Sequence, residues 1–244
     1  MSTALATNPG LRLWSVLASS IATRARLLAL GALGLGAVLL GIGVRLANPT
    51  DRAGAAWSVV NGYGLSLLVP VVALVFASAS LGDPSEDGTL VYLWLRPVPR
   101  WQLALSAFAA SVTVVAPIAV APLVVGAAVT GTGWRLVAAS AAGGMLATVA
   151  YSAVFCGLGL RVRRALAWGL AYLLIWEEAV ARISHGAARV SLFVSTRSLA
   201  ASIARHTPPP RNSVAPLTGL VFPLVVTVVA LAVTARSLDR GEVT

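Results

Sequence analysis

The stretch D-P-S-E-D-G-T-L-V-Y-L-W-L-R-P-V-P-R, from Asp83 to Arg100, separates two long uncharged runs of the chain. Asp83 followed by Pro84 predicts a helix start, because aspartate can accept a first-turn N–H and proline there loses only a donor without a partner. Glu86 and Asp87 would follow in the first turn, where the positive end of the helix dipole favours carboxylates. Apolar residues then recur at helical spacing until two prolines end the pattern. We therefore predict a short helix over 83–96, with an acidic tip and an apolar face, between two membrane spans.

Such a helix has two interpretations on its mechanics alone. Its apolar face could rest on lipid, as loop helices of membrane proteins often do. Alternatively, the helix could be a docking element that a soluble partner binds.

The residues of this stretch are also similar to a family signature. The positions that carry the similarity are Glu86, Asp87, Gly88, Thr89, Leu90, Arg96, Pro97, Val98, Pro99 and Arg100. They resemble the pattern E-x-G-T-L … P-[hydrophobic]-x-R of permease subunits of ABC-2-type transporters, and the resemblance covers essentially the whole chain. In that family the stretch includes the coupling helix that meets the ATP-binding subunit. The resemblance implies that such a subunit contacts Asp83, Glu86, Asp87, Gly88, Thr89, Leu90, Arg96 and Arg100. Basic residues that often follow the arginine in that family are absent here.

The composition excludes an ordinary soluble domain, because 58% of the residues are hydrophobic and 11% are charged. The net charge of +10 comes from eighteen arginines, and the chain contains no lysine. A phosphate-binding loop needs a lysine to reach the β- and γ-phosphates. We therefore expect no cofactor in this chain, with ATP and Mg²⁺ bound by a separate ATPase subunit. The arginines are scattered at span ends, which argues against binding of nucleic acid.

The order of apolar runs predicts an all-α integral membrane protein with one permease domain over 1–244. An amphipathic pattern at 11–26 predicts an interfacial helix, similar to the elbow helix of the resembled family. The predicted spans lie at about 27–46, 57–80, 103–129, 136–160, 165–183 and 213–235. Between the last two spans, 184–211 predicts surface-lying or partly re-entrant helices on the outer side.

Six spans would place both termini on one side of a bacterial cytoplasmic membrane. That side would carry ten arginines, whereas the opposite short loops carry Arg45, Arg52 and Arg135. The positive-inside rule then makes the ten-arginine side cytoplasmic. The segment 182–211 adds five arginines to the outside. The alternative is a cytoplasmic location of that segment, with a fifth run that is a hairpin or does not span.

Glu177 and Glu178 are the only acidic residues inside a predicted span. Ionisable groups at such depth usually face a cavity or a partner, so the pair could line a substrate or proton pathway. Alternatively, the helix breaks here and Glu178 pairs with Arg182 four residues later. Adjacent residues on a helix point about 100° apart, so at most one of the two glutamates faces a given cavity.

Other polar residues suggest no chemistry. His185 and His206 have no cluster of ligands around them, so we expect no metal site. Thr148 and Ser152, in the fourth predicted span, are expected to hydrogen-bond their own helix backbone.

Three functions fit these observations. The first is the permease subunit of an ABC-2-type exporter. Two copies, or one copy and a related chain, would form the pore among membrane lipids, and the resemblance implies an amphipathic substrate such as a drug, natural product, lipid or glycan. The alternatives are a lipid-modifying membrane enzyme and an ion-coupled carrier, each using Glu177 or Glu178. No catalytic residues are identifiable, so we expect no enzymatic activity in this chain by itself.

Overall fold

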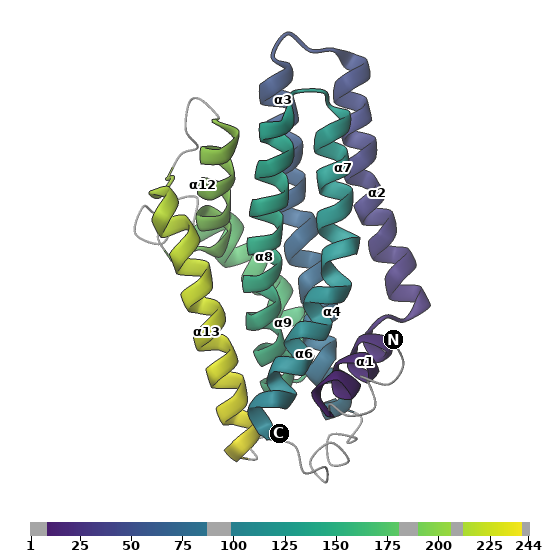
Figure 1. Ribbon diagram of the computed structural model, residues 1–244, viewed down its shortest axis with the longest axis vertical. Helices are drawn as coiled ribbons and strands as arrows, with labels where there is room; N and C mark the ends of the chain where they lie inside the picture. The colour runs from purple at the N-terminus through teal and green to yellow at the C-terminus, as the bar shows by residue number, and fades with distance from the viewer. Residues whose placement is uncertain (1–8, 87–98, 181–189, 206–211, 241–244) are drawn as a thin grey trace.

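The computed structural model of the protein describes residues 9–86, 99–180, 190–205 and 212–240. Every regular element in these ranges is a helix, and the long helices run along the long axis of the molecule (Figure 1). In chain order the elements are α1 (Pro9–Ile21), α2 (Arg24–Ala47), α3 (Arg52–Ser58), η2 (Val59–Leu68), α4 (Val69–Glu86), α6 (Arg100–Val115), η3 (Ala116–Val120), α7 (Ala121–Val129), α8 (Trp134–Arg161), α9 (Ala165–Ala171), η4 (Tyr172–Val180), α12 (Leu192–Ala204) and α13 (Pro216–Arg240). The three η elements are π-helical stretches that continue the α-helices beside them.

Five helical stretches in the described residues are long and apolar enough to cross a membrane. They are Arg24–Ala47, Arg52–Ser85, Arg100–Val129, Trp134–Arg161 and Pro216–Asp239. Two of them pass through π-helical turns without interruption, because α3, η2 and α4 form one long helix and α6, η3 and α7 form another. The protein is therefore an all-helical, multi-pass membrane protein in its described part.

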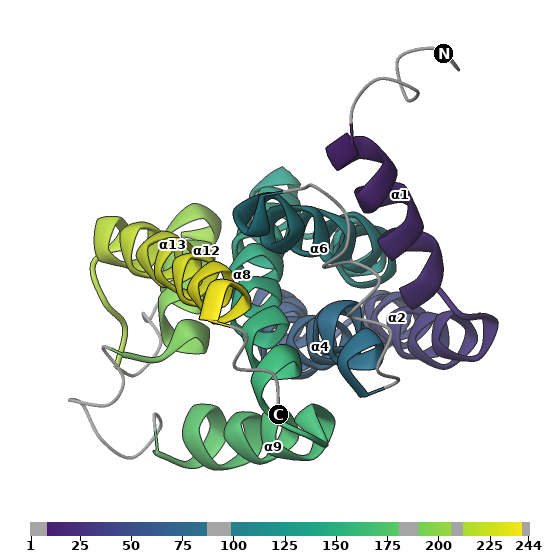
Figure 2. The ribbon, with the colours of Figure 1, turned by 90° about the horizontal axis from the view of Figure 1, so that it is seen from below.

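Two helices form the centre of the bundle. In its most apolar stretch, the helix that ends in α4 is 78% buried and α8 is 61% buried. The corresponding share is 22% for α2, 28% for the α6–α7 helix and 22% for α13. Seen from below, α4 and α8 lie between α2 on one side and α13 on the other (Figure 2). The outer helices thus present large apolar surfaces, which lipid or another membrane subunit can cover.

Glycines bring the backbones of neighbouring helices into contact. A Cβ atom placed on Gly159 of α8 would lie 2.1 Å from the carbonyl oxygen of Ser78 in α4. A Cβ atom on Gly41 of α2 would lie 2.3 Å from the carbonyl oxygen of Gly126 in α7. Small residues at such points are the usual basis of helix packing in membranes, where dispersion contacts replace the hydrophobic effect.

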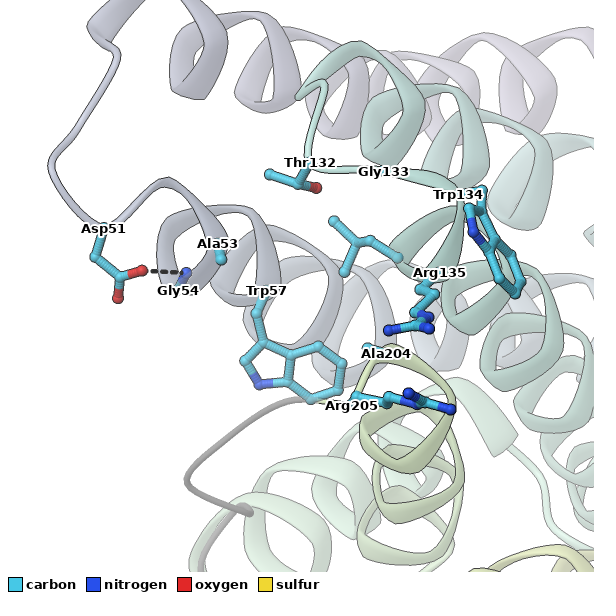
Figure 3. A pocket seen from close by; sticks show the side chains of 11 residues that line it. Asp51, Ala53, Gly54, Trp57, Thr132, Gly133, Trp134, Arg135, Ala204 and Arg205 are labelled. Atoms are coloured by element: carbon cyan, nitrogen blue, oxygen red, sulfur yellow. Dashed lines mark hydrogen bonds between the residues drawn. The ribbon is translucent and has the colours of Figure 1, made fainter.

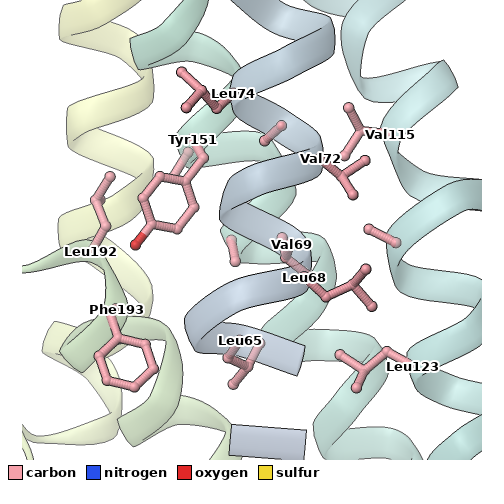
Figure 4. Close-up of a cluster of buried hydrophobic side chains, with 14 of the residues drawn as sticks. Leu65, Leu68, Val69, Val72, Leu74, Val115, Leu123, Tyr151, Leu192 and Phe193 are labelled. Atoms are coloured by element: carbon pink, nitrogen blue, oxygen red, sulfur yellow. The ribbon is translucent and has the colours of Figure 1, made fainter. Parts of the chain in front are cut away.

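The main core is built from side chains of the two central helices and the helices around them. Leu68 and Val72, in the helix that ends in α4, are fully buried together with Val115 and Leu123 from the α6–α7 helix. Tyr151 of α8 is also fully buried and lies on the side of the core that α12 covers (Figure 4).

The fifth predicted span, at 165–183, is not among the candidate spans. The described part of the continuous helix α9–η4 has sixteen residues, so it is about 24 Å long at 1.5 Å per residue, less than the ~30 Å hydrocarbon layer. It begins beside Asp83 at the lower end of the bundle in Figure 1. The end of α12 lies beside Trp57 and Trp134 at the upper end. The chain therefore returns from the lower to the upper end in two pieces, α9–η4 and α12.

The helix α12 lies inside the bundle, so the surface-lying alternative that the sequence suggested for 184–211 is wrong for this helix. The partly re-entrant alternative is not tested. Eight of its thirteen residues are buried. A Cβ atom on Gly143 of α8 would lie 2.9 Å from Ala200, and one on Gly219 of α13 would lie 2.8 Å from the carbonyl oxygen of Ser195. The helix is thus packed tightly between α8 and α13.

Hydroxyl groups inside the bundle behave in two ways. Ser78 and Ser111 donate to carbonyl oxygens four residues earlier in their own helices, at 2.6 and 2.8 Å. Thr148 and Ser152 of α8 are fully buried, and their hydroxyl oxygens have no hydrogen-bond partner. The expectation that these two residues bond their own helix backbone is therefore wrong.

Candidate functional site

The candidate site is the lower end of the bundle, where α4 ends and α6 begins. Asp83 and Pro84 lie in the last turn of α4, which continues to Glu86, so they do not start a new helix. The Asp83 carboxylate forms a tertiary contact instead of a helix cap, because Arg26 Nη1 donates to Asp83 Oδ2 at 2.8 Å. The local Asp-Pro signal does not start a helix here, because α4 continues through it and the carboxylate pairs with Arg26 at the start of α2.

Only part of the predicted contact surface for an ATP-binding subunit can be placed. Arg100 opens α6 and is half-buried, at the same end of the bundle as Asp83. The remaining members of that set lie outside the described residues: the side chain of Glu86, and Asp87, Gly88, Thr89, Leu90 and Arg96. The predicted helix over 83–96 therefore has its first four positions in α4 and the others outside the description.

A second buried cluster, here called the base cluster, lies at the same end. Its largest members are Leu17, Leu81, Leu103, Leu160 and Leu238, all at most 4% exposed. They come from α1, α4, α6, α8 and α13 respectively. Because α4 and α6 are the two helices that flank 87–98, both ends of that segment are attached to one packed unit.

The helix α1 belongs to this unit. Leu13, Leu17 and Ile21 are at most 4% exposed, and Trp14 Nε1 donates to Thr113 Oγ1 of α6 at 3.3 Å. The amphipathic pattern that predicts an interfacial helix over 11–26 thus corresponds to a helix whose apolar face packs on the bundle. The helix ends at Ile21, and α2 begins three residues later.

A pocket of about 370 Å³ opens beside the ion pair of Arg26 and Asp83. Ser78 and Gly82 of α4 line one part of it, and Arg164 with Ala165 at the start of α9 line another. The side chains of the ion pair are 28% and 46% exposed. Three chain segments that are far apart in sequence therefore meet at one pocket at this end.

Glu177, which the sequence suggested as part of a substrate or proton pathway, lies inside the bundle against the start of α12. It is 3% exposed and accepts hydrogen bonds from the hydroxyl groups of Tyr172 and Ser191, at 3.0 and 2.5 Å. It also accepts from the backbone N–H groups of Leu192 and Phe193, at 3.2 and 3.1 Å. Each carboxylate oxygen receives two of the four donors.

This carboxylate caps the start of α12. The first N–H groups of a helix have no partner within it, and the positive end of the helix dipole favours a negative group. Ser191 is the N-cap residue and accepts from Val194 N at 3.0 Å, so it satisfies a third N–H group. An ionised carboxylate has about four acceptor positions, and all are used. Glu177 therefore joins η4 to the start of α12, and four donors occupy its acceptor positions.

The side chains of Glu178 and Arg182 lie outside the described residues, so their predicted pairing is not tested. Sequence reasoning missed Ser191, although a signal was present. A serine directly before an apolar helical run is a common N-cap. The long-range contact to Glu177 had no such signal.

The comparison with protein families agrees with this architecture. A model of the family described as ABC-2 family transporter protein matches residues 23–175, which is more than half of the chain. The matched part holds four of the five candidate spans and the stretch from Asp83 to Arg100. No curated protein matches the chain. The resemblance found in the sequence is confirmed, and the chain belongs to the ABC-2 family of transporter proteins.

Proposed function

We propose that this chain is the membrane-spanning permease subunit of an ABC-2-type exporter. A separate ATP-binding subunit, which holds ATP and Mg²⁺, drives export of an amphipathic substrate across a bacterial cytoplasmic membrane, and both termini are cytoplasmic. The family match supports a transporter permease. The packing of helices at the lower end of the bundle supports the proposal that the ATP-binding subunit docks there.

The observation that carries this proposal is the attachment of the segment 87–98. Its two flanking helices contribute Leu81 and Leu103 to the base cluster, together with residues from α1, α8 and α13. Packed cores are close to crystalline density and transmit displacement instead of absorbing it. A partner that moves this segment therefore shifts the lower ends of five helices together.

The ion pair of Arg26 and Asp83 extends this connection to α2. Arg26 lies in the first turn of α2, and Asp83 lies in the last turn of α4. Because α2 is an outer helix with much exposed apolar surface, its displacement changes the face that the protein presents to lipid or to a second subunit. A second copy or a related permease chain is the partner that we propose for this face.

The alternative functions find less support. A lipid-modifying enzyme or an ion-coupled carrier would need a carboxylate that can exchange a proton with a substrate. The four donors around Glu177 occupy its acceptor positions, and its side chain is buried. A capping role explains the acidic residue without chemistry.

The test is co-expression of this chain with ABC ATP-binding subunits from the same genome, followed by purification and measurement of ATP hydrolysis in lipid nanodiscs. The double variant Glu86→Ala with Asp87→Ala should lose complex formation or stimulated hydrolysis. Asp239→Asn is the matched control, because Asp239 is an exposed carboxylate at the same end of the bundle, on α13. It should leave both readings unchanged.

Two results would contradict the proposal in different ways. If no ATPase associates with the unmodified chain, the permease-subunit function fails. If the complex forms and hydrolyses ATP equally well with both carboxylates removed, the docking place at 83–100 fails while the subunit function stands.

A further inference from the structure

A second pocket, here called the upper pocket, opens at the end of the bundle opposite to the base cluster. Its volume is about 430 Å³, within the range of small-molecule sites. It is formed where three elements end: the start of α3, the loop between α7 and α8, and the end of α12. One candidate membrane span ends with α7 and the next begins with α8 at this loop. The pocket therefore lies at a membrane–water boundary.

The upper pocket carries more positive than negative charge. Arg135 and Arg205 line it, and both are exposed. Within the described part of the chain neither guanidinium group forms an ion pair. Asp51 is the only lining carboxylate, and its Oδ1 already accepts from Gly54 N at 2.8 Å as the N-cap of α3.

The start of α8 adds to this positive potential. This helix has twenty-eight residues, no side-chain cap at Gly133 and no acidic residue in its first turn. Carboxylates are favoured at such an end and cations are not, yet Arg135 is the second residue of the helix. The pocket thus combines two guanidinium groups with the positive end of a long helix, and an anion between them would relieve this repulsion.

Aromatic rings flank the charged part of the pocket. In the view of Figure 3 the guanidinium groups of Arg135 and Arg205 lie between the rings of Trp57 and Trp134. Trp57 is 6% exposed and Trp134 is 73% exposed. Arg135 also lies over the Trp134 ring, with its Cζ atom 5.7 Å from the ring centroid. Tryptophan is enriched at the headgroup level of membranes, which places the two arginines where phosphate groups of lipids lie.

We propose that the upper pocket binds the phosphate group of an anionic membrane amphiphile, held by Arg135 and Arg205 with its apolar part beside Trp57 and Trp134. Guanidinium groups present paired donors that match phosphate oxygens. The first N–H groups of α8 add further donors at the same place. This site is independent of the ATP-binding subunit and lies at the other end of the bundle from the segment 87–98.

The experiment uses the full-length chain in detergent and three soluble probes. They are dihexanoyl phosphatidylglycerol, which is anionic, dihexanoyl phosphatidylcholine, which is zwitterionic, and inorganic phosphate. Binding is followed by isothermal titration, and circular dichroism checks the fold of each variant. Arg135→Gln and Arg205→Gln should each weaken binding of the phosphatidylglycerol probe by about tenfold, the usual effect of removing one charge-assisted hydrogen-bonding partner.

The matched control for net charge is Arg45→Gln. Arg45 is an exposed arginine at the same end of the bundle, but it does not line the pocket. This variant should bind the phosphatidylglycerol probe as the unmodified chain does. A second variant, Ala53→Leu, keeps both arginines and fills the pocket from an exposed position on α3. It should also weaken binding, and it keeps the proposal testable if an arginine variant does not fold.

Each other outcome overturns the proposal. Equal binding of the two lipid probes would show that the site does not distinguish an anionic from a zwitterionic headgroup. An equal loss with Arg45→Gln would show attraction by the surface as a whole. Inorganic phosphate that binds as tightly as phosphatidylglycerol, and with the same response to the variants, would show a site for a free anion instead of an amphiphile.

Discussion

Arg26 and Asp83 are 57 positions apart in the chain, and Arg26 Nη1 lies 2.8 Å from Asp83 Oδ2. This contact ties the first turn of α2, an outer helix, to the last turn of α4, a central one. It lies next to the segment that we propose as the docking place. The pair is well placed to couple movement of that segment to α2.

The first prediction concerns this pair. Asp83→Asn and Arg26→Gln should each change the free energy of unfolding by only about 0.2–1 kcal/mol, because partly exposed ion pairs contribute little to stability. Each should nevertheless lower the ATP hydrolysis that the permease stimulates in its partner subunit. A double-mutant cycle read by hydrolysis should show that the two effects are not additive. Additive effects would mean that the pair does not act as one connection.

The second prediction concerns the joint between η4 and α12. Glu177→Leu leaves four donors without an acceptor, and each buried unsatisfied donor costs about 1–3 kcal/mol. We therefore expect a loss of at least about 3 kcal/mol in the free energy of unfolding in detergent. Glu177→Gln should be milder, because its amide oxygen still accepts two hydrogen bonds. Ser191→Ala should be the mildest of the three.

Thermal unfolding in detergent measures this order directly. Equal stability of Glu177→Leu and the unmodified chain would contradict the capping role. If transport were lost in Glu177→Gln with no loss of stability, Glu177 would instead belong to a substrate or proton pathway.

The third prediction concerns the contact of α4 with α8. Gly159→Ala places a methyl group against the carbonyl oxygen of Ser78, so the two central helices must separate. Overpacking of this kind costs about 1–3 kcal/mol. Gly31→Ala on α2 is the control, because no atom lies within 4 Å of the added group. It should be neutral or stabilising by up to about 1 kcal/mol, since alanine is the better helix former.

The fourth prediction concerns orientation in the membrane. Ser19→Cys on α1 and Thr50→Cys before α3 place exposed thiols at opposite ends of the bundle. In a Cys156→Ser background, a membrane-impermeant maleimide added to intact cells should label the cysteine at 50. The cysteine at 19 should react only after the membrane is opened. The reverse pattern would place the lower end outside the cell.

The unmodified chain provides the reference for that experiment. Its single cysteine, Cys156, is fully buried, and its sulfur lies 3.2 Å from Ser80 Oγ and 3.5 Å from Ser111 Oγ. It should stay unlabelled in folded protein on both sides of the membrane. It should react once the chain is unfolded in a denaturing detergent.

The long apolar runs could be predicted from the sequence because burial in lipid depends mainly on composition and length. The start of α8 at Trp134 follows from a run without charge after an aromatic residue, whereas α13 continues past the predicted end of its span at 235 to Arg240. The helix start at Asp83 could not be judged in the same way. Its local capping signal is strong, but the carboxylate pairs with Arg26, which is distant in sequence.

The fifth predicted span shows more clearly that local sequence does not reveal contacts between distant residues. Hydropathy predicts a span from 165 because the run is apolar. An acidic residue inside such a span, Glu177, then suggests either a substrate or proton pathway or a break in the helix. The structure satisfies that carboxylate with Ser191, Leu192 and Phe193, which the sequence places in a separate segment. Only the three-dimensional arrangement reveals that a carboxylate of η4 caps the start of α12.

The arrangement of α9–η4 and α12 as two separate short helices has a consequence for biosynthesis. The described part of α9–η4 is about 24 Å long and α12, with thirteen residues, is about 20 Å long, so each is shorter than the ~30 Å hydrocarbon layer. When the ribosome has made only α9–η4, the insertion machinery meets a segment that is too short to be retained as a span. The N-terminus that Glu177 caps is synthesised later. On its other side α12 packs against α13, and Val214, which precedes α13, donates from its backbone N–H to Ser198 Oγ. A part of the chain that is synthesised later is therefore required to fix the position of a part made before it.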